Sequence, residues 1–164
     1  MNNYTTDSEV SKYVLWDKHE SMSDTLDAIR FMRRQYRLGR PASYAIIHKE
    51  TARMIGTIGF MWIDVTNRSG EIGYSLSREY WNQGYATEAL RKLIDFSFKT
   101  LKLHRVEAQY DIRNQASGRV MQKAGMNLEG TLHDRLINKG EYCTVSIYAI
   151  INPEEKKRKK YVHL

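Results

Sequence analysis

The sequence contains very little cysteine and proline: its 164 residues include one cysteine, Cys143, and two prolines. A single thiol cannot form a disulfide within the chain or a metal site made of several cysteines. The five histidines are scattered, and no two of them have the spacing of an H-x-x-x-H pair, so we expect no metal. We expect Cys143 to be a small buried residue on the last strand rather than a nucleophile.

Long hydrophobic runs are also absent. No apolar stretch approaches the ~20 residues that span a bilayer. The start, Met1–Asp7, does not have the composition of a signal peptide. A chain with one free thiol and no membrane segment fits a reducing compartment. We therefore expect a cytoplasmic protein that does not act at a membrane.

Acidic residues are fewer than basic ones, and the formal net charge is +7. Residues 153–164 contribute five basic and two acidic residues, and we expect a single domain at 1–152 followed by this basic tail. Basic charge suits a protein that binds a multiply anionic cofactor, and it also suits approach to RNA. Because the charge is concentrated in a tail without interleaved aromatic residues, an RNA-binding module is the least favoured alternative. We expect no specific nucleic acid partner.

Two common phosphate-binding motifs, G-x-x-x-x-G-K-[ST] and G-x-G-x-x-G, are missing. The chain has instead a strand-like stretch, Glu71–Leu76, and a helix-like stretch, Ala86–Leu101, joined by a turn. Gly84 and Ala86 leave room for an anion at the helix N-terminus, where backbone N–H groups and the helix dipole favour phosphate. The alternative is an ordinary tight turn between a strand and a helix.

The other segments alternate between helical and strand-like patterns, which predicts an α+β fold with a mixed sheet and helices on both faces. One short helix is expected near Asp7–Val14, and a second helix across Asp24–Leu38 with Ser23 as its N-cap. The remaining predicted elements are the strands Ser43–Lys49, Met54–Asp64, Arg105–Tyr110, Met126–Thr131 and Tyr142–Ile150, and the helix Asn114–Ala124. The tryptophans are expected mostly in the core.

The turn and a later segment together resemble the GNAT superfamily of acetyl-CoA-dependent N-acetyltransferases. Trp81–Ala89 is similar to the loop that binds the pyrophosphate of CoA in that family, and Asn114–Met126 is similar to its second CoA-binding segment. Four motifs resemble the RimJ/RimL branch, the type that acetylates N-termini of ribosomal proteins: Glu71–Tyr74, Leu103–Arg105, Asn114–Ser117 and Glu129–Gly130. The resemblance extends from about Tyr4 to Ile150.

This resemblance implies a GNAT fold, with a twisted, mostly antiparallel mixed sheet between helices, and acetyl-CoA as the cosubstrate. It implies CoA-binding roles for ten residues: Tyr74, Leu76, Gln83, Gly84, Tyr85, Ala86, Thr87, Asn114, Ser117 and Lys123. The family's usual first strand has no counterpart in this chain. Because a bare sheet edge favours association, we expect either a homodimer or an arrangement in which Met1–Thr6 lies along the sheet.

The reaction that the resemblance implies is direct attack of a neutral amine on the acetyl thioester in a ternary complex. Glu71 is the candidate general base; the alternative is a surface glutamate that pairs with Arg68. Many relatives protonate the leaving thiolate with a tyrosine four residues before the glycine of the second CoA segment, where this chain has Met121. Ser117 and Asn114 are the nearest polar replacements, although both could serve only as CoA contacts.

The acceptor that the resemblance favours is the α-amine of a protein, such as a ribosomal protein. It would enter between the N-terminal helices and the region Ile137–Cys143, with Trp16 and Tyr36 on the wall of the site. Two alternatives stay open. An enzyme for a small amine, such as a polyamine or an aminoglycoside, predicts a closed acidic pocket. A non-catalytic acyl-CoA-binding module is favoured by Met121 and by the missing first strand.

Overall fold

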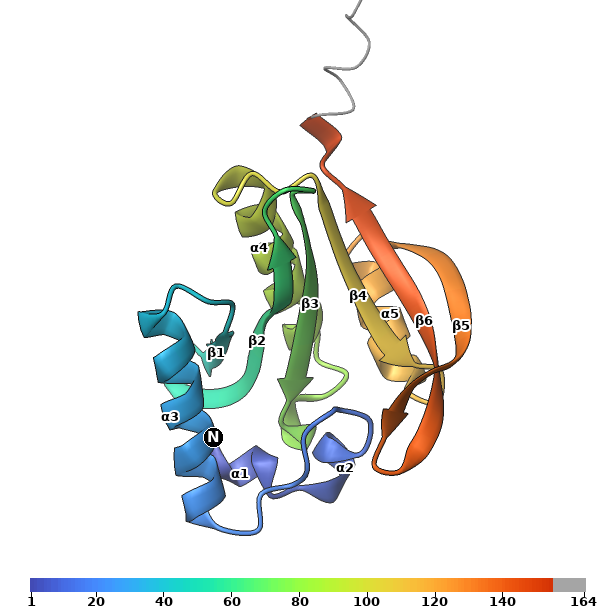
Figure 1. The fold of residues 1–164 in the computed structure, drawn as a ribbon. Helices are drawn as coiled ribbons and strands as arrows, with labels where there is room; N and C mark the ends of the chain where they lie inside the picture. The colour runs from blue at the N-terminus through green and yellow to red at the C-terminus, as the bar shows by residue number, and fades with distance from the viewer. Residues whose placement is uncertain (155–164) are drawn as a thin grey trace, which may run out of the picture.

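A computed structural model describes residues 1–154, and its strands form one mixed sheet (Figure 1). The six strands lie in the order β1-β2-β3-β4-β6-β5. They are β1 Ser43–His48, β2 Arg53–Asp64, β3 Ser69–Leu76, β4 Arg105–Asp111, β5 Asn127–Asn138 and β6 Glu141–Ile151. All neighbours are antiparallel except β3 and β4, which are parallel. The predicted mixed, mostly antiparallel sheet is confirmed.

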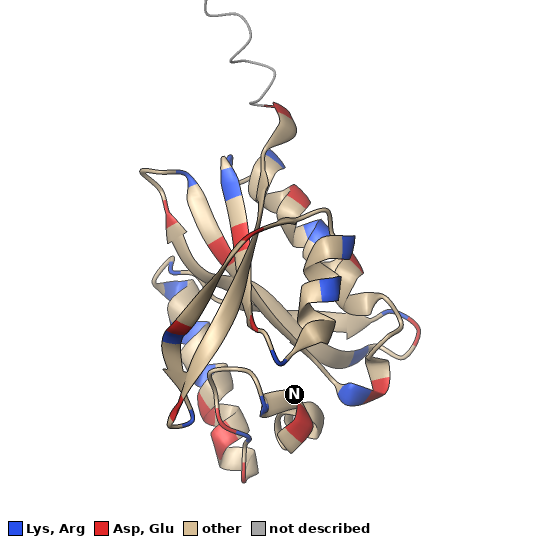
Figure 2. Ribbon diagram, turned by 90° about the vertical axis from the view of Figure 1, so that its right-hand side faces the viewer, with Lys and Arg blue, Asp and Glu red and all other residues tan. Residues whose placement is uncertain are grey.

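Helices lie on both sides of this sheet. They are α1 Asn2–Thr5, α2 Ser8–Ser11, α3 Met22–Arg37, the 3₁₀ helix η1 Arg78–Tyr80, α4 Tyr85–Lys99 and α5 Gln115–Lys123. The helices α4 and α5 cover one face, while α3 lies on the opposite side and α1 and α2 lie near the end of β3 (Figures 1 and 2). No helix within residues 1–154 is long and apolar enough to cross a bilayer.

The core lies between the sheet and α4. The helix buries residues at the spacing of one helical face, as its sequence predicts: Leu90, Leu93, Ile94 and Ser97. Leu90, Leu93 and Ile94 belong to one cluster with apolar side chains from the central strands, among them Ile58, Phe60, Ile72 and Val106. This packing fixes α4 against β2 and β3, and so fixes the turn that leads into the helix.

The central strands β3 and β4 separate part of the way along the sheet. Their parallel pairing includes only Ser69–Glu71 on β3 and Arg105–Glu107 on β4. Beyond this point β3 stays paired with β2 as far as Leu76, and β4 stays paired with β6 as far as Asp111. Both strands therefore continue, but an opening forms between them, and its narrow end lies at Glu71.

The N-terminal segment forms a helix rather than a strand. Tyr4 and Thr5 of α1 are buried, and the Tyr4 hydroxyl donates a hydrogen bond to Thr57 Oγ1 on β2 over 3.4 Å. The segment thus packs against the sheet, but it does not pair along an edge. Within residues 1–154 no strand pairs with the outer side of β1, and the homodimer that we expect from this edge stays a prediction. Most of the predicted basic tail, from residue 155 on, lies outside the described residues.

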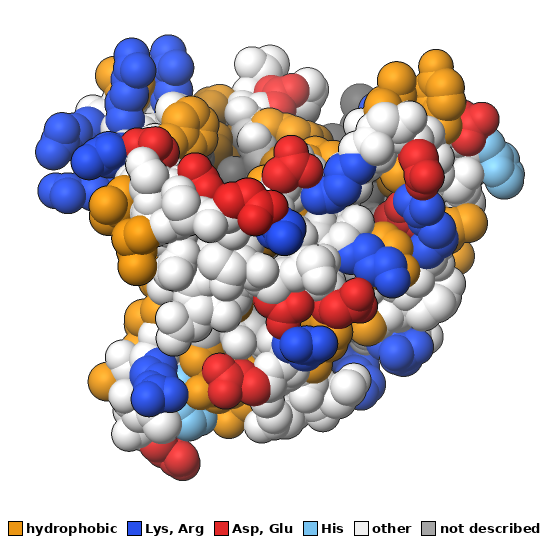
Figure 3. Space-filling view, turned by 90° about the horizontal axis from the view of Figure 1, so that it is seen from below, with side chains coloured by type: hydrophobic (Ala, Val, Ile, Leu, Met, Phe, Trp, Pro, Cys, Tyr) orange, Lys and Arg blue, Asp and Glu red, His pale blue; other side chains and the backbone are white. Residues whose placement is uncertain are grey.

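The prediction for the start of α3 was wrong by two residues. The N-cap is Ser21, whose side chain accepts a hydrogen bond from the Asp24 backbone, while the Asp24 carboxylate accepts one from the Ser21 backbone. This reciprocal capping box satisfies two N–H groups that Ser23 could not reach. Acidic residues occupy the first half of the helix and basic residues the second (Figure 2), as the helix dipole favours. Seen from below, basic side chains gather at one edge of the molecule (Figure 3).

Candidate active site

A cavity of about 300 Å³ opens where β3 and β4 separate. Its walls come from β3, β4, the first turns of α5, the loop at residues 13–16, and the hairpin of β5 and β6. Four of the residues expected at the site line it together: Glu71, Tyr74, Asn114 and Ser117. Trp16 also lines it, as expected, whereas Tyr36 is not among its lining residues and donates a hydrogen bond to the Ser43 carbonyl.

Glu71 lies half-buried at the narrow end of the opening. One carboxylate oxygen accepts a hydrogen bond from the Trp62 indole over 2.7 Å, and the other accepts one from the Gln109 amide over 2.9 Å. Both donors are neutral. Arg68, the alternative partner, donates instead to the Lys102 carbonyl over 2.8 Å. Within residues 1–154, Glu71 therefore places at the wall of the cavity a carboxylate that forms no ion pair.

Ser117 and Tyr74 form a polar pair on the same wall. The Tyr74 hydroxyl lies 2.8 Å from Ser117 Oγ and donates to the Ser117 carbonyl over 3.0 Å, which ties the first turn of α5 to β3. Asn114 is the N-cap of α5, and its side chain accepts a hydrogen bond from the Ser117 backbone over 3.4 Å. Burial raises the pKa of Tyr74, so its hydroxyl stays neutral. The Ser117 hydroxyl beside it is the second hydroxyl on this wall of the cavity.

The predicted phosphate turn has the geometry that an anion needs. Gly84 is the N-cap of α4 with φ +90°, and because glycine has no side chain it cannot cap the first turn as serine or aspartate would. A Cβ atom built at Gly84 would have no heavy atom within 4 Å. The N–H groups of Tyr85, Ala86 and Thr87 begin the helix and have no acceptor one turn earlier. The turn therefore leaves open space in front of free donors, which fits a pyrophosphate group.

The other CoA-binding candidates differ in how accessible they are. Gln83 donates to the Glu79 carbonyl over 2.7 Å, and Tyr85 lies 3.0 Å from His48 Nε2 through its hydroxyl. Thr87 and Leu76 are only 8% and 7% exposed, which leaves the Thr87 hydroxyl little access to an anion. Lys123 lies at the C-terminal end of α5, away from the first turn that lines the cavity.

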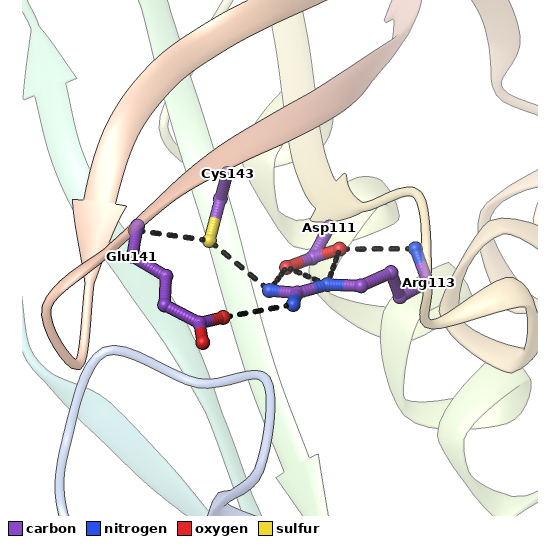
Figure 4. Close-up of polar contacts among 4 residues, drawn as sticks. All are labelled: Asp111, Arg113, Glu141 and Cys143. Atoms are coloured by element: carbon purple, nitrogen blue, oxygen red, sulfur yellow. Dashed lines mark hydrogen bonds and ion pairs between the residues drawn. The ribbon is translucent and has the colours of Figure 1, made fainter.

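Cys143 lies on the cavity wall beside an ion pair (Figure 4). Asp111 and Arg113 form a two-pronged pair with a shortest distance of 2.6 Å, and Arg113 also contacts Glu141 over 3.2 Å. The Cys143 thiol is 2% exposed, and its burial, with the neighbouring Asp111 carboxylate, raises its pKa. A thiol in this state is a poor nucleophile, which agrees with the expected structural role.

The contacts of Trp62 and Gln109 with Glu71 could not be predicted from local sequence patterns. The indole of Trp62 was expected in the core, but it is 38% exposed and faces the carboxylate. Gln109 lies in the middle of a predicted strand, where nothing in the sequence marks it as different from its neighbours. Among residues 1–154, no group of three or more histidine, cysteine, aspartate or glutamate side chains is arranged to hold a metal ion.

Comparisons with known proteins identify the family to which this chain belongs. The model of the acetyltransferase (GNAT) domain matches residues 1–127. The N-acetyltransferase p20 of Bacillus licheniformis is 36% identical over 151 residues, which cover 92% of this chain and 85% of the relative. The ribosomal-protein-serine acetyltransferase of Escherichia coli is 33% identical over 110 residues, which cover 67% of this chain and 61% of the relative.

A solved structure of similar shape supports the same family. An acetyltransferase (GNAT family) from Bacillus anthracis superposes with a TM-score of 0.82 at 29% sequence identity, and the match covers 93% of this chain and 87% of that one. The chain that matches this family has three notable features: central strands that separate, an open turn before α4, and a polar start to α5. The chain belongs to the GNAT family of acetyltransferases, and it is an acetyl-CoA-dependent N-acetyltransferase.

Proposed function

We propose that this N-acetyltransferase is of the RimJ/RimL type and transfers the acetyl group to the α-amine of a protein N-terminus. The observation that carries the proposal is the charge inside the cavity. Its lining residues include two carboxylates, Glu71 and Asp111. Arg113 pairs with Asp111 over 2.6 Å, whereas the hydrogen-bond partners of Glu71 are neutral. The cavity therefore offers one uncompensated negative charge.

One uncompensated carboxylate suits an acceptor with one amino group. A polyamine or an aminoglycoside carries several cationic amines, and burying them requires a carboxylate for each. The other walls are largely aromatic and apolar, with Tyr13, Trp16 and Tyr110 among them. Such walls fit the first side chain of a peptide better than a second ammonium group. The similarity to a ribosomal-protein-serine acetyltransferase supports the same acceptor.

An α-amine also needs less help from a general base than a lysine side chain does, because more of it is already neutral at pH 7. Its pKa is about 8, so roughly a tenth of it is neutral at pH 7, whereas a lysine side chain with a pKa of about 10.4 is neutral some two orders of magnitude less often. A carboxylate such as Glu71 then needs only to accept a proton through a water molecule as the new bond forms. This requirement matches a single carboxylate held by neutral donors.

In the proposed reaction each group of residues has a separate role. Acetyl-CoA supplies the acetyl thioester, and the turn at Gly84 with the first N–H groups of α4 binds its pyrophosphate. Backbone N–H groups of β3 beyond Glu71, which have no partner on β4, stabilise the oxyanion. The amine nitrogen bonds to the acetyl carbon, the carbon–sulfur bond breaks, and Glu71 takes the amine proton. Ser117 gives a proton to the thiolate and regains one, through water, from the protonated Glu71, so that both residues are restored and the products are an amide and a thiol.

A panel of acceptors tests this proposal. Peptides with a free α-amine are compared with the same peptides blocked at the N-terminus but carrying one lysine, with spermidine, and with an aminoglycoside. We expect the free α-amine to be preferred, with the lysine peptides slower by roughly 10²-fold at pH 7. Release of free thiol and the mass of the product give the rates and the site of acetylation.

Two outcomes would contradict the proposal. Preference for spermidine or for the aminoglycoside would show that the cavity accepts several cationic amines and would favour a small-molecule enzyme. Binding of CoA without release of thiol above background for any amine would favour a non-catalytic acyl-CoA-binding module. A matched pair of peptides that differ only in the blocked N-terminus keeps sequence preference out of the comparison.

A further inference from the structure

We infer that Trp62 and Gln109 are positioning residues, which hold the Glu71 carboxylate in the orientation from which it accepts the amine proton. The inference rests on the proposed role of Glu71 as base, but not on the acceptor being a protein. The two donors approach from opposite neighbours of β3: Trp62 belongs to β2 and Gln109 to β4. Their hydrogen bonds go to different oxygens, over 2.7 Å and 2.9 Å.

An irregularity in β2 brings Trp62 opposite Glu71. The register of β2 and β3 passes from Phe60 opposite Ile72 directly to Trp62 opposite Glu71, which leaves Met61 as an extra residue in β2. Such a bulge changes which side chain faces a given partner. In a regular ladder Met61 would stand opposite Glu71, and a thioether cannot donate a hydrogen bond. The bulge thus places an N–H donor beside the carboxylate.

Gln109 reaches Glu71 along a diagonal across the opening. Glu71 pairs with Glu107 in the last register pair of β3 and β4, and Gln109 lies two residues further along β4, on the same face as Glu107. A long side chain can bridge that diagonal spacing. The Gln109 amide therefore makes the link between the two strands at the point where they separate, next to the cavity.

The charges around Glu71 are arranged so that its carboxylate stays available. Glu107, directly opposite, is paired with Arg105 over 2.8 Å, and Arg105 also holds Glu129 over 2.6 Å. The neutral indole and amide orient Glu71 without neutralising it. Each carboxylate oxygen accepts more than one hydrogen bond, so both oxygens keep a free position for the water or the amine. Two fixed donors restrict a glutamate side chain that would otherwise be mobile.

The contact itself is tested without any reaction. The chain has three tryptophans, so a ¹H–¹⁵N spectrum has three indole N–H signals, and the Trp62→Phe variant identifies that of Trp62. We expect this signal to move in Glu71→Ala, because its acceptor is lost. The signal of Trp81 is the internal control, because Trp81 donates to the Leu76 carbonyl over 2.8 Å and does not line the cavity; it should not move. A Trp62 signal that stays in place would overturn the inference.

The positioning role is tested by a double-mutant cycle. Trp62→Phe keeps an aromatic ring but removes the indole N–H, and Gln109→Leu removes the amide. We expect each change to lower kcat by about tenfold, while KM for acetyl-CoA stays the same. In the Glu71→Gln background neither change should lower kcat further, because nothing remains to be positioned. The assay uses the acceptor that turns over fastest, so it does not depend on the acceptor's class.

Several results would contradict the inference, and they differ from a failure of the proposed acceptor. If Trp62→Phe or Gln109→Leu lowered kcat as much in the Glu71→Gln background as in the wild type, then Trp62 and Gln109 would contribute only to the stability of the fold. A wild-type rate in Glu71→Gln would show that Glu71 is not the base, and it would therefore also contradict the positioning role of Trp62 and Gln109. Thr131→Val is the control, because it breaks another hydrogen bond between strands, to Ser146 over 2.8 Å, away from the cavity. Should Gln109→Leu fail to fold, Gln109→Asn, which is too short to reach, replaces it.

Discussion

Replacing Glu71 with glutamine is expected to lower kcat by about 10²-fold, the lower end of what a general base contributes. Glutamine keeps the size of the side chain and can still accept the Trp62 hydrogen bond, so the cavity should keep its shape. The amide cannot take a proton from the amine. Steady-state release of free thiol measures the rate, and calorimetry should show unchanged affinity for CoA, because Glu71 lies on β3, apart from the Gly84 turn that fits the pyrophosphate.

The size of this loss should depend on the acceptor. A lysine-type amine is almost fully protonated at pH 7 and needs the base more than an α-amine does, so its loss should be larger. Glu50→Gln, in the exposed turn between β1 and β2, is the matched control and should keep the wild-type rate. A Glu71→Gln enzyme within about twofold of wild type on both acceptors would leave Glu71 with a structural role only.

Local patterns in the sequence predicted the parts of the fold that depend on neighbouring residues. Leu90, Leu93 and Ile94 recur at helical spacing and are buried on α4 as that spacing requires. Gly84 lies directly before α4, in the turn between a strand and a helix that the sequence predicted. The start of α3 could also have been predicted, because Ser21 and Asp24 have the spacing of a capping box, which marks the N-cap better than Ser23 does.

Longer-range features could not be predicted in this way. β5 continues to Asn138, seven residues beyond its predicted end. The prediction stopped too early because residues 132–138 lack the alternation of apolar and polar side chains that marks a strand; in the structure most of them are exposed. The pairing of Trp62 with Glu71 depends on the bulge at Met61, and that of Gln109 depends on the register of β3 with β4. The register of a sheet is set by packing between strands that are distant in the sequence. The motif at Glu71 therefore predicted a candidate base, but the sequence could not predict the two side chains that hydrogen-bond to it.

Replacing Gly84 with glutamate is expected to weaken CoA binding by at least tenfold, which corresponds to about 1.4 kcal/mol. The side chain would enter the open space in front of the first turn of α4, and its charge would occupy the donors that fit the pyrophosphate. Calorimetry with CoA measures the affinity, and circular dichroism should show a native fold, since a Cβ at this position meets no other atom within 4 Å.

Gly39→Glu separates the effect of the site from the strain of the substitution. Gly39 also has a positive φ, +64°, and open space around a built Cβ, but it follows the C-terminal end of α3, whereas Gly84 precedes the N-terminus of α4. The two variants therefore carry the same new charge, each at a backbone position with positive φ. Only Gly84→Glu should lose affinity for CoA, because only this glutamate lies at the N-terminus of α4. Equal affinities in two folded variants would place the pyrophosphate away from the Gly84 turn, and equal losses would mean that strain, not the site, weakens binding.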